Sequence, residues 1–213
     1  MKPQTQKINY KGDVILVEGF DDEKLIRKLL PSGLQKNIIQ LGGYTYLATR
    51  LESIKLNTKS FQTDINSLLI IIDADDNFGN RKKNVVDLLN RNGLILSTTY
   101  KLGTIEWLNG INVGVFILPD NRNSGSLERL LLESVEHKNL LACTDNMISC
   151  RNSSNTPFQN LTQNQLDKVK FRLYMNTLVA DYDFTYKDTF AAEIDYSHSC
   201  FDDLKLFVTT KSI

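Results

Sequence analysis

The sequence predicts an α/β fold: a mostly parallel central sheet with helices on both faces, plus a small helical appendage at the C-terminal end. Two observations predict it. The aliphatic run Leu68–Ile72 has no polar alternation, which is typical of a central strand buried on both faces. Runs of this kind alternate along the chain with segments whose apolar residues recur at helical spacing. That alternation favours parallel strands joined by crossover helices.

Each expected element has its own sequence signal. The strands are short runs of Val, Ile and Leu, and the helices have apolar residues three and four positions apart. Pro31 stops the first helix, and the pair Asn92-Gly93 ends the third in the manner of a C-cap. In chain order we expect strands over residues 14–17, 37–41, 68–73 and 113–118, followed in turn by helices over 21–30, 44–56, 85–91 and 126–134.

The composition changes after the last of these helices, which suggests a division of the chain. Residues 10–145 are expected to form the α/β core. Residues 146–160 are rich in Asn and Ser and predict a polar loop. Residues 161–213 are expected to form a helical extension packed on the core, with helices over 161–180 and 200–208.

Charge and cysteine content limit the functional classes. The 213-residue chain has 25 basic and 25 acidic residues, so its net charge is zero. A dedicated non-specific nucleic-acid binder is usually basic, so any nucleic-acid contact here must come from a local patch. Cys143, Cys150 and Cys200 form no paired motif and are interpreted as free thiols. With no signal peptide and no run of membrane-spanning length, we expect a cytoplasmic protein without a membrane partner.

Acidic residues follow two of the predicted strands. Asp73 and Asp75 come after the central run, and Glu18 follows the first strand. Ligands of α/β sheets gather outside the carboxyl ends of the strands, and residues two apart in an extended chain point the same way. Carboxylates that share a site repel each other unless a cation neutralises them. These acids therefore predict a site for Mg²⁺ or Mn²⁺.

One Glu with an Asp-x-Asp pair suits phosphoryl or phosphodiester chemistry. The metal would neutralise phosphate oxygens, and Glu18 would act as general acid or base or help to hold a second ion. The other interpretation of Asp73 and Asp75 is a helix cap after a strand. Asp120, at another strand end, is equally suited to be a ligand or a turn residue.

The sequence Val17-Glu18-Gly19 after one strand, with Asp73-Ala74-Asp75 after a later one, resembles the Toprim domain. That domain is shared by topoisomerases, bacterial primases, the overcoming-lysogenization-defect nucleases and ribosomal-RNA maturases. The resemblance covers Val14 to about Val135, and it extends to small stand-alone Toprim-like proteins through the segments 114–121 and 125–131. It implies that Glu18 is the catalytic acid and that Asp73 and Asp75 bind Mg²⁺. It also implies that Glu128 is an additional acid of nuclease-type members.

The chain departs from the Toprim pattern after the Asp-x-Asp pair. Family members often have a glycine two or three residues on, whereas Asp76, Asn77 and Phe78 come before Gly79 here. Asp76 is therefore a further ligand, or the site is altered and non-catalytic. Nearby, the run Arg81-Lys82-Lys83 places cations at a helix start, where they oppose the helix dipole. A bound phosphate backbone or the acid cluster would explain them, and so would a solvated face.

The expected function is Mg²⁺-dependent cleavage or transfer at a phosphodiester, most like a nuclease acting on DNA or RNA. The alternative is a non-catalytic module that binds nucleotide, nucleic acid or a partner protein. A phosphatase or phospho-acceptor domain fits less well, because Asn77 stands where the haloacid-dehalogenase motif has Thr or Val, and the first strand offers only Glu18. Three carboxylates within metal-bridging distance would favour the enzyme. An acid covered by a neighbouring Lys or Arg would favour the binding module.

Overall fold

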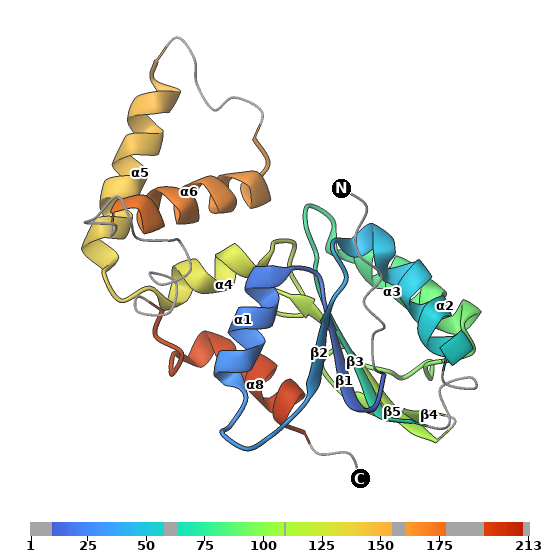
Figure 1. Cartoon of the computed structure of the whole chain (residues 1–213). Helices are drawn as coiled ribbons and strands as arrows, with labels where there is room; N and C mark the ends of the chain where they lie inside the picture. The colour runs from blue at the N-terminus through green and yellow to red at the C-terminus, as the bar shows by residue number, and fades with distance from the viewer. Residues whose placement is uncertain (1–9, 58–63, 109, 155–160, 178–193, 211–213) are drawn as a thin grey trace, which may run out of the picture. The chain divides into compact units, whose positions relative to one another are not determined.

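The computed structural model describes residues 10–57, 64–108, 110–154, 161–177 and 194–210 (Figure 1). The chain divides into two compact units. The first comprises Met1–Ile72, Gly79–Ile117 and Leu204–Ile213, and the second comprises Asp73–Phe78 and Leu118–Asp203. Each unit is described by itself.

A five-stranded, mostly parallel sheet forms the centre of the first unit, with the order β2-β1-β3-β5-β4. β1 pairs in parallel with β2 on one side and with β3 on the other, while β4 pairs antiparallel with β5. β3 is the longest strand, and six of its residues in a row are buried, as a strand covered on both faces requires. The strands are β1 (Gly12–Val17), β2 (Asn37–Gln40), β3 (Ile65–Asp73), β4 (Ile105–Leu108) and β5 (Ile111–Leu118).

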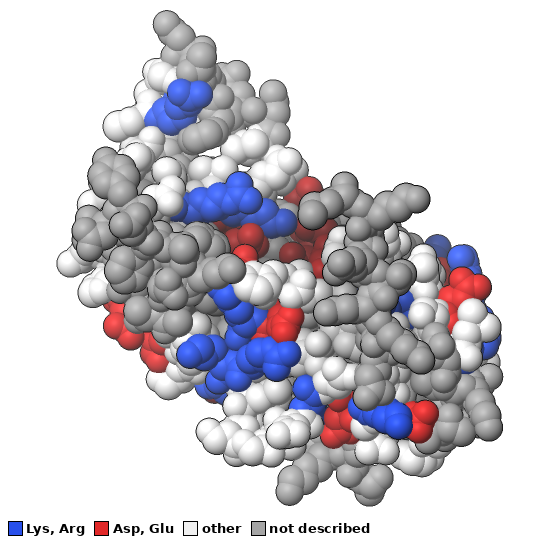
Figure 2. Space-filling view, in the orientation of Figure 1, with Lys and Arg blue, Asp and Glu red and all other residues white. Residues whose placement is uncertain are grey.

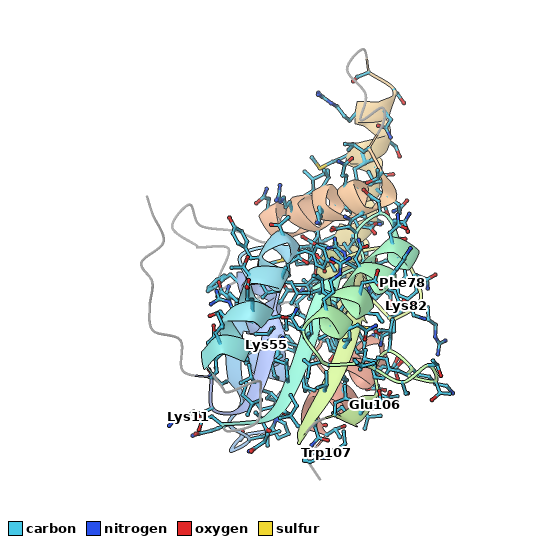
Figure 3. All side chains as sticks on the ribbon, turned by 90° about the vertical axis from the view of Figure 1, so that its right-hand side faces the viewer. Lys11, Lys55, Phe78, Lys82, Glu106 and Trp107 are labelled. Atoms are coloured by element: carbon cyan, nitrogen blue, oxygen red, sulfur yellow. The ribbon has the colours of Figure 1, made fainter. Side chains whose placement is uncertain are left out.

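Helices cover both faces of this sheet. Figures 1 and 3 show α1 (Phe20–Leu29) and α8 (Asp202–Thr209) on one face, with α2 (Leu47–Asn57) and α3 (Phe78–Arg91) on the other. The short 3₁₀ helix η1 (Tyr44–Tyr46) leads into α2. The sequence therefore predicted the fold class correctly. No described helix is both long and apolar enough to cross a membrane.

The last helix of the chain packs tightly on the sheet because the sheet has a glycine beneath it. Phe207 of α8 is buried and contacts the ring of Phe116 on β5, with 5.5 Å between ring centroids. A Cβ atom on Gly114 would lie only 2.7 Å from the Phe207 ring. Lys36 Nζ donates to the carbonyl oxygen of Thr210 just beyond the helix, at 3.2 Å. The expected terminal helix is therefore present, and it packs on the sheet of the first unit.

The second unit is built from helices around one aromatic core. Its elements are α4 (Leu127–Ser134), α5 (Lys138–Asn152), α6 (Gln163–Thr177) and the 3₁₀ helix η2 (Ser199–Phe201). Tyr174, Phe171 and Phe201 are its largest fully buried side chains. Val135 and Ile194 form an isolated antiparallel bridge, which fixes the segment after α4 to the segment before η2.

Two elements differ from the sequence-based expectation. β4 was not predicted, because its four residues are only partly buried and lie at the sheet edge, where apolar periodicity is weak. α5 continues to Asn152, although a polar loop was expected from residue 146. Most of its residues are exposed or only partly buried, and only Thr144 and Ile148 are buried. Part of the expected loop, residues 155–160, and the end of the expected helix, residues 178–180, lie outside the described residues.

Candidate functional site

The residues at the end of β3 leave the extended conformation at once. Asp73 is the last residue of the strand, and Asp75 has a left-handed backbone with φ of 52°. The Asp75 carbonyl accepts a 2.7 Å hydrogen bond from the Gly125 backbone, and the two residues form a β-bridge. Asp73 and Asp75 therefore do not share one side of an extended chain, contrary to the expectation from the sequence. Their orientation is set by the contacts that each makes.

Asp73 faces the start of α4. Its Oδ1 accepts a 3.1 Å hydrogen bond from the backbone N–H of Leu127, the first residue of that helix. Glu128 is the next residue, and its carboxylate accepts a 2.7 Å hydrogen bond from the Ser126 hydroxyl. Ser126 is completely buried. The structure thus brings two of the predicted metal-binding acids, Asp73 and Glu128, to the same helix N-terminus, where the helix dipole favours negative charge.

Asp75 instead meets two side chains of α6. Asn164 Nδ2 donates to Asp75 Oδ1 at 3.2 Å, and Lys168 Nζ lies 3.6 Å from the same oxygen. Asn164 and Lys168 are one helical turn apart, so both project from the same face of α6. Neither residue could be predicted from the sequence, because nothing in the local pattern of α6 indicates a contact with an acid so distant along the chain, which is 89 positions away in the case of Asn164. Asp76 is exposed.

In the first unit, Glu18 is held by the loop that follows β2. Its backbone carbonyl accepts hydrogen bonds from the N–H groups of Gly42 and Gly43, both at 3.1 Å. Both glycines have positive φ, a conformation that favours glycine, so this turn can direct two donors at one oxygen. The side-chain Oε1 accepts a 3.2 Å hydrogen bond from the N–H of Tyr44. Glu18 is therefore fixed in position at the carboxyl end of β1.

The Tyr44 ring connects this acid to the predicted cationic segment. The Arg81 guanidinium lies over the ring, 3.7 Å from its centroid, which is a cation–π contact. Burial raises the pKa of Tyr44; the charge of Arg81 opposes this rise and the charge of Glu18 adds to it. Arg81 is half-buried near the start of α3, whereas Lys82 (labelled in Figure 3) and Lys83 are exposed. The three cations therefore do not form one equivalent cluster.

β1 and β3 are neighbouring parallel strands in which Val17 pairs with Ile71. Glu18 directly follows β1 in the first unit, and Asp73 is the last residue of β3 and belongs to the second unit. Within the described residues, no group of three or more His, Cys, Asp or Glu side chains is arranged to hold a metal ion.

Asn164 is 6% exposed, and its Oδ1 accepts no hydrogen bond from the described part of the chain. The amide nitrogen of Asn164, rather than this oxygen, faces Asp75. Carboxylates are ligands that Mg²⁺ and Mn²⁺ prefer, so Asp73, Asp75 and Glu128 are described residues of the second unit that could hold such an ion.

Asp120 is a turn residue. Its carboxylate accepts hydrogen bonds from the backbone N–H groups of Arg122 and Asn123, at 3.0 and 2.8 Å, and from the Asn123 side chain at 2.6 Å. Burial by itself would raise the pKa of Asp120, but these hydrogen bonds and the charge of Arg129 outweigh it and lower the pKa. These local hydrogen bonds explain the position and ionisation of Asp120 without a metal.

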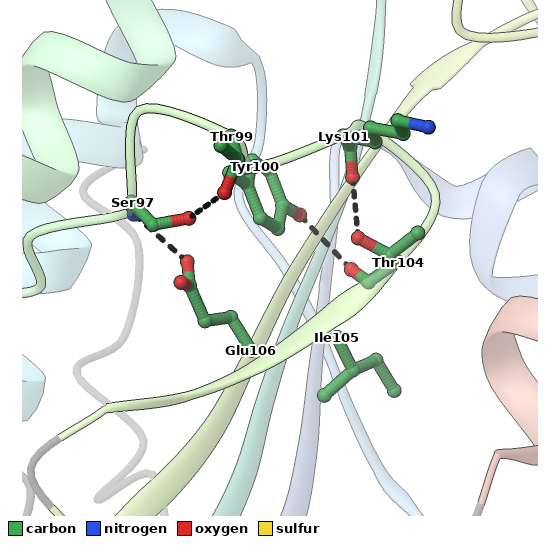
Figure 4. Close-up of a pocket in the computed structure, with 7 residues that line it drawn as sticks. All are labelled: Ser97, Thr99, Tyr100, Lys101, Thr104, Ile105 and Glu106. Carbon is green, nitrogen blue, oxygen red and sulfur yellow. Dashed lines mark hydrogen bonds between the residues drawn. The ribbon is translucent and has the colours of Figure 1, made fainter.

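A surface hollow elsewhere in the first unit lies beside β4 and is lined by residues between Ser97 and Glu106 (Figure 4). The Tyr100 hydroxyl donates to the Thr104 carbonyl at 3.0 Å and accepts from the Val115 N–H at 2.7 Å. Burial raises the pKa of Tyr100 well above its usual value. Glu106 accepts a hydrogen bond from the Ser97 N–H. These polar groups stabilise the loop before β4, and none of the predicted site residues lines the hollow.

Among the described residues on the face shown in Figure 2, acidic and basic side chains are interspersed. A family model described as "Protein of unknown function (DUF3226)" matches residues 12–207. No curated protein and no solved structure matches the chain. Because the family match covers most of its length, the chain belongs to the DUF3226 family.

Proposed function

We propose that this protein is a divalent-metal-dependent phosphodiester-cleaving or phosphoryl-transfer protein that acts on nucleic acid in the manner of a Toprim-like nuclease. The observation that supports the proposal is the position of Asp73 beside the start of α4. The Leu127 N–H donates to Asp73, the last residue of β3, and Glu128 is the next residue of α4, so the two acids supply carboxylates at one strand end, where α/β sheets bind ligands. Mg²⁺ or Mn²⁺ would be held by Asp73 and Asp75, with Glu128 and Asp76 as further candidate ligands.

The chain's own residues have separate roles in this proposal. When bound, the metal would neutralise phosphate charge and lower the pKa of a water or hydroxyl. Glu18, fixed by the Tyr44 N–H and the two glycine N–H groups, would transfer the proton as general acid or base. Arg81, held over the Tyr44 ring, would contact a substrate phosphate, and Lys82 and Lys83 would add sequence-independent attraction to the backbone.

The second candidate function is a non-catalytic module that binds nucleotide, nucleic acid or a partner protein. A specific contact favours it: Lys168 lies 3.6 Å from the Asp75 carboxylate and partly neutralises the acid without any metal. In such a module, Lys168 and Asp75 would serve as a fixed polar pair for recognition, and Glu18 would be a structural acid of the β1 end.

Calorimetric titration with Mn²⁺ and Mg²⁺ separates the two candidates. We expect the wild type to bind metal and the double variant Asp73→Asn, Asp75→Asn to lose that binding. Asp203→Asn, an isosteric change at an exposed acid of α8, is the matched control and should bind as the wild type does. Cleavage of labelled single- and double-stranded DNA and RNA would then be compared between the wild type and Glu18→Gln.

Each outcome selects one candidate. Metal binding lost in the double variant, together with cleavage lost in Glu18→Gln, supports the enzyme. Metal binding absent from the wild type at millimolar concentrations, with or without oligonucleotide, rejects the metal-dependent function and leaves the binding module.

A further inference from the structure

Two exposed aromatic side chains of the first unit lie close in sequence to the groups that fix Glu18. Among the described residues, three large aromatic side chains are exposed: Phe20 at 46%, Tyr46 at 57% and Trp107 at 59%. Phe20 is two residues after Glu18, and Tyr46 is two residues after Tyr44, whose N–H binds the Glu18 carboxylate. A single exposed aromatic residue needs no explanation, but two beside one candidate catalytic acid indicate a binding surface.

The segments that carry the two rings are fixed to each other. β1 and β2 are neighbouring parallel strands. α1 begins at Phe20, after β1, and η1 ends at Tyr46, after β2. The turn before η1 is bonded to the end of β1, because the N–H groups of Gly42 and Gly43 both donate to the Glu18 carbonyl oxygen. Both rings therefore belong to the carboxyl ends of these strands, where α/β sheets bind ligands.

Cations are held on aromatic rings in the same two segments. Lys24 Nζ lies 4.8 Å from the centroid of the Phe20 ring, and the Arg81 guanidinium lies 3.7 Å from the centroid of the Tyr44 ring. The negative face of each ring attracts its cation and so fixes the position of the positive charge. Aromatic rings combined with positive charge are the features by which proteins bind a nucleic-acid strand.

Two acidic residues in the first turn of α1 are held by local contacts. Asp22 is buried and accepts a 2.8 Å hydrogen bond from the Gly19 N–H. Glu23 pairs with Arg27 at 2.6 Å and accepts a 2.6 Å hydrogen bond from the Gln40 side chain. These contacts partly neutralise the negative charge near the two rings, so that charge does not exclude a polyanion.

Exposed rings fit unpaired bases better than a duplex. In a duplex the faces of the bases are stacked on one another, whereas a single strand can turn its bases onto aromatic side chains. A protein that binds only the duplex backbone needs cations along that backbone and gains nothing from exposed rings.

We propose that Phe20 and Tyr46 form a base-stacking surface for single-stranded nucleic acid beside Glu18. The proposal rests on the proposed function, because it names the form of nucleic acid that this site would take. Lys24 and Arg81 would supply positive charge along the strand, and the stacked bases would hold a phosphodiester near Glu18. A partner protein that covers the same rings is the competing occupant.

The test measures the fluorescence anisotropy of labelled oligothymidylate, oligouridylate and a mixed-sequence duplex, without metal so that no strand is cleaved. Phe20→Leu and Tyr46→Leu remove a ring and keep an apolar side chain, and each should weaken single-strand binding about fivefold or more. Duplex binding should change less. Phe20→Tyr and Tyr46→Phe keep the ring and should bind as the wild type does. Trp107→Leu is the matched control, because Trp107 is equally exposed but lies on β4, at the opposite edge of the sheet from β2 (Figure 3).

Intrinsic fluorescence gives a second readout that does not depend on catalysis. Trp107 is the single tryptophan of the chain. In a Trp107→Phe background, Tyr46→Trp therefore places the only tryptophan on the proposed surface. Stacking of a base on this indole should quench its emission when oligothymidylate is added, whereas the emission of Trp107 in the wild type should not change. If a leucine variant does not fold, this quenching decides, and its absence at a saturating strand concentration overturns the proposal.

The possible failures are distinguishable. Wild-type single-strand affinity in folded Phe20→Leu and Tyr46→Leu variants overturns only the stacking surface and leaves a partner protein as the occupant of the rings. Binding of the duplex but not of single strands by the wild type has the same consequence. If the wild type binds no nucleic acid, with or without Mn²⁺, this inference and the nucleic-acid substrate of the proposed function fail together.

Discussion

Replacing Lys168 with Met tests whether the lysine ammonium competes with a divalent metal ion for Asp75. Lys168 Nζ lies 3.6 Å from Asp75 Oδ1, and about a third of each side chain is exposed. Methionine keeps much of the length and apolar surface of the side chain but removes the charge. If Asp75 binds a divalent ion, Lys168 competes with that ion for the same oxygen. We therefore expect Lys168→Met to bind Mn²⁺ more tightly than the wild type.

Two contributions set the magnitude. Ion pairs with this degree of exposure are worth about 0.2–1 kcal/mol, and metal binding must break this one. Repulsion between a divalent ion and an ammonium that has moved to about 8 Å adds about 1 kcal/mol in water. Removing both gives about 1–2 kcal/mol, which is about a 5- to 30-fold rise in affinity. In the metal-free variant, loss of the ion pair with Asp75 should cost no more than about 1 kcal/mol of stability.

Calorimetric titration with Mn²⁺ at fixed ionic strength measures the effect. Lys170→Met is the matched control, because Lys170 lies on the same helix and pairs with Asp145 at 2.7 Å, away from the predicted ligands. That variant should bind Mn²⁺ with wild-type affinity. Unchanged or weaker Mn²⁺ binding by Lys168→Met would refute the competition argument. Loss of oligonucleotide binding in that same variant would then identify Lys168 as a recognition residue of a binding module.

Two further predictions concern stability. Gly114→Ala places a Cβ 2.7 Å from the buried Phe207 ring, so overpacking should cost about 1–3 kcal/mol of stability and outweigh the usual gain of Ala over Gly in a strand. Adding Phe207→Leu should restore part of the melting temperature. If the effects of the two substitutions simply add, the two residues do not clash. Tyr196 stacks on Phe201, and burial raises the pKa of Tyr196 to about 12. The folded state therefore keeps a proton that the unfolded state releases above about pH 10. The free energy of unfolding should fall by about 1 kcal/mol between pH 10 and 12. Tyr196→Phe should reduce that fall in urea titrations across this range, and an equal fall in the variant would exclude Tyr196 as its cause.

The sequence was most informative where burial is continuous. The aliphatic runs at 14–17 and 68–72 became β1 and the centre of β3, since a strand covered on both faces must be apolar at every position. The partly buried edge strand β4 and the mainly solvent-facing helix α5 were missed for the same reason, because neither has a strong apolar pattern. Periodicity reports burial, and it is weak where burial is partial.

At the candidate site, too, the sequence predicted local features but not tertiary contacts. The sequence by itself determined that acids follow two buried strands, because a charged residue can stand only where such a strand leaves the core. Only the tertiary structure decided their partners: Asp73 meets the start of α4, and Asp75 meets Asn164 and Lys168 of α6. Contacts between residues 54 and 89 positions apart depend on how helices pack. The periodicity of strands and helices depends only on residues close together in the sequence, so it does not predict such contacts.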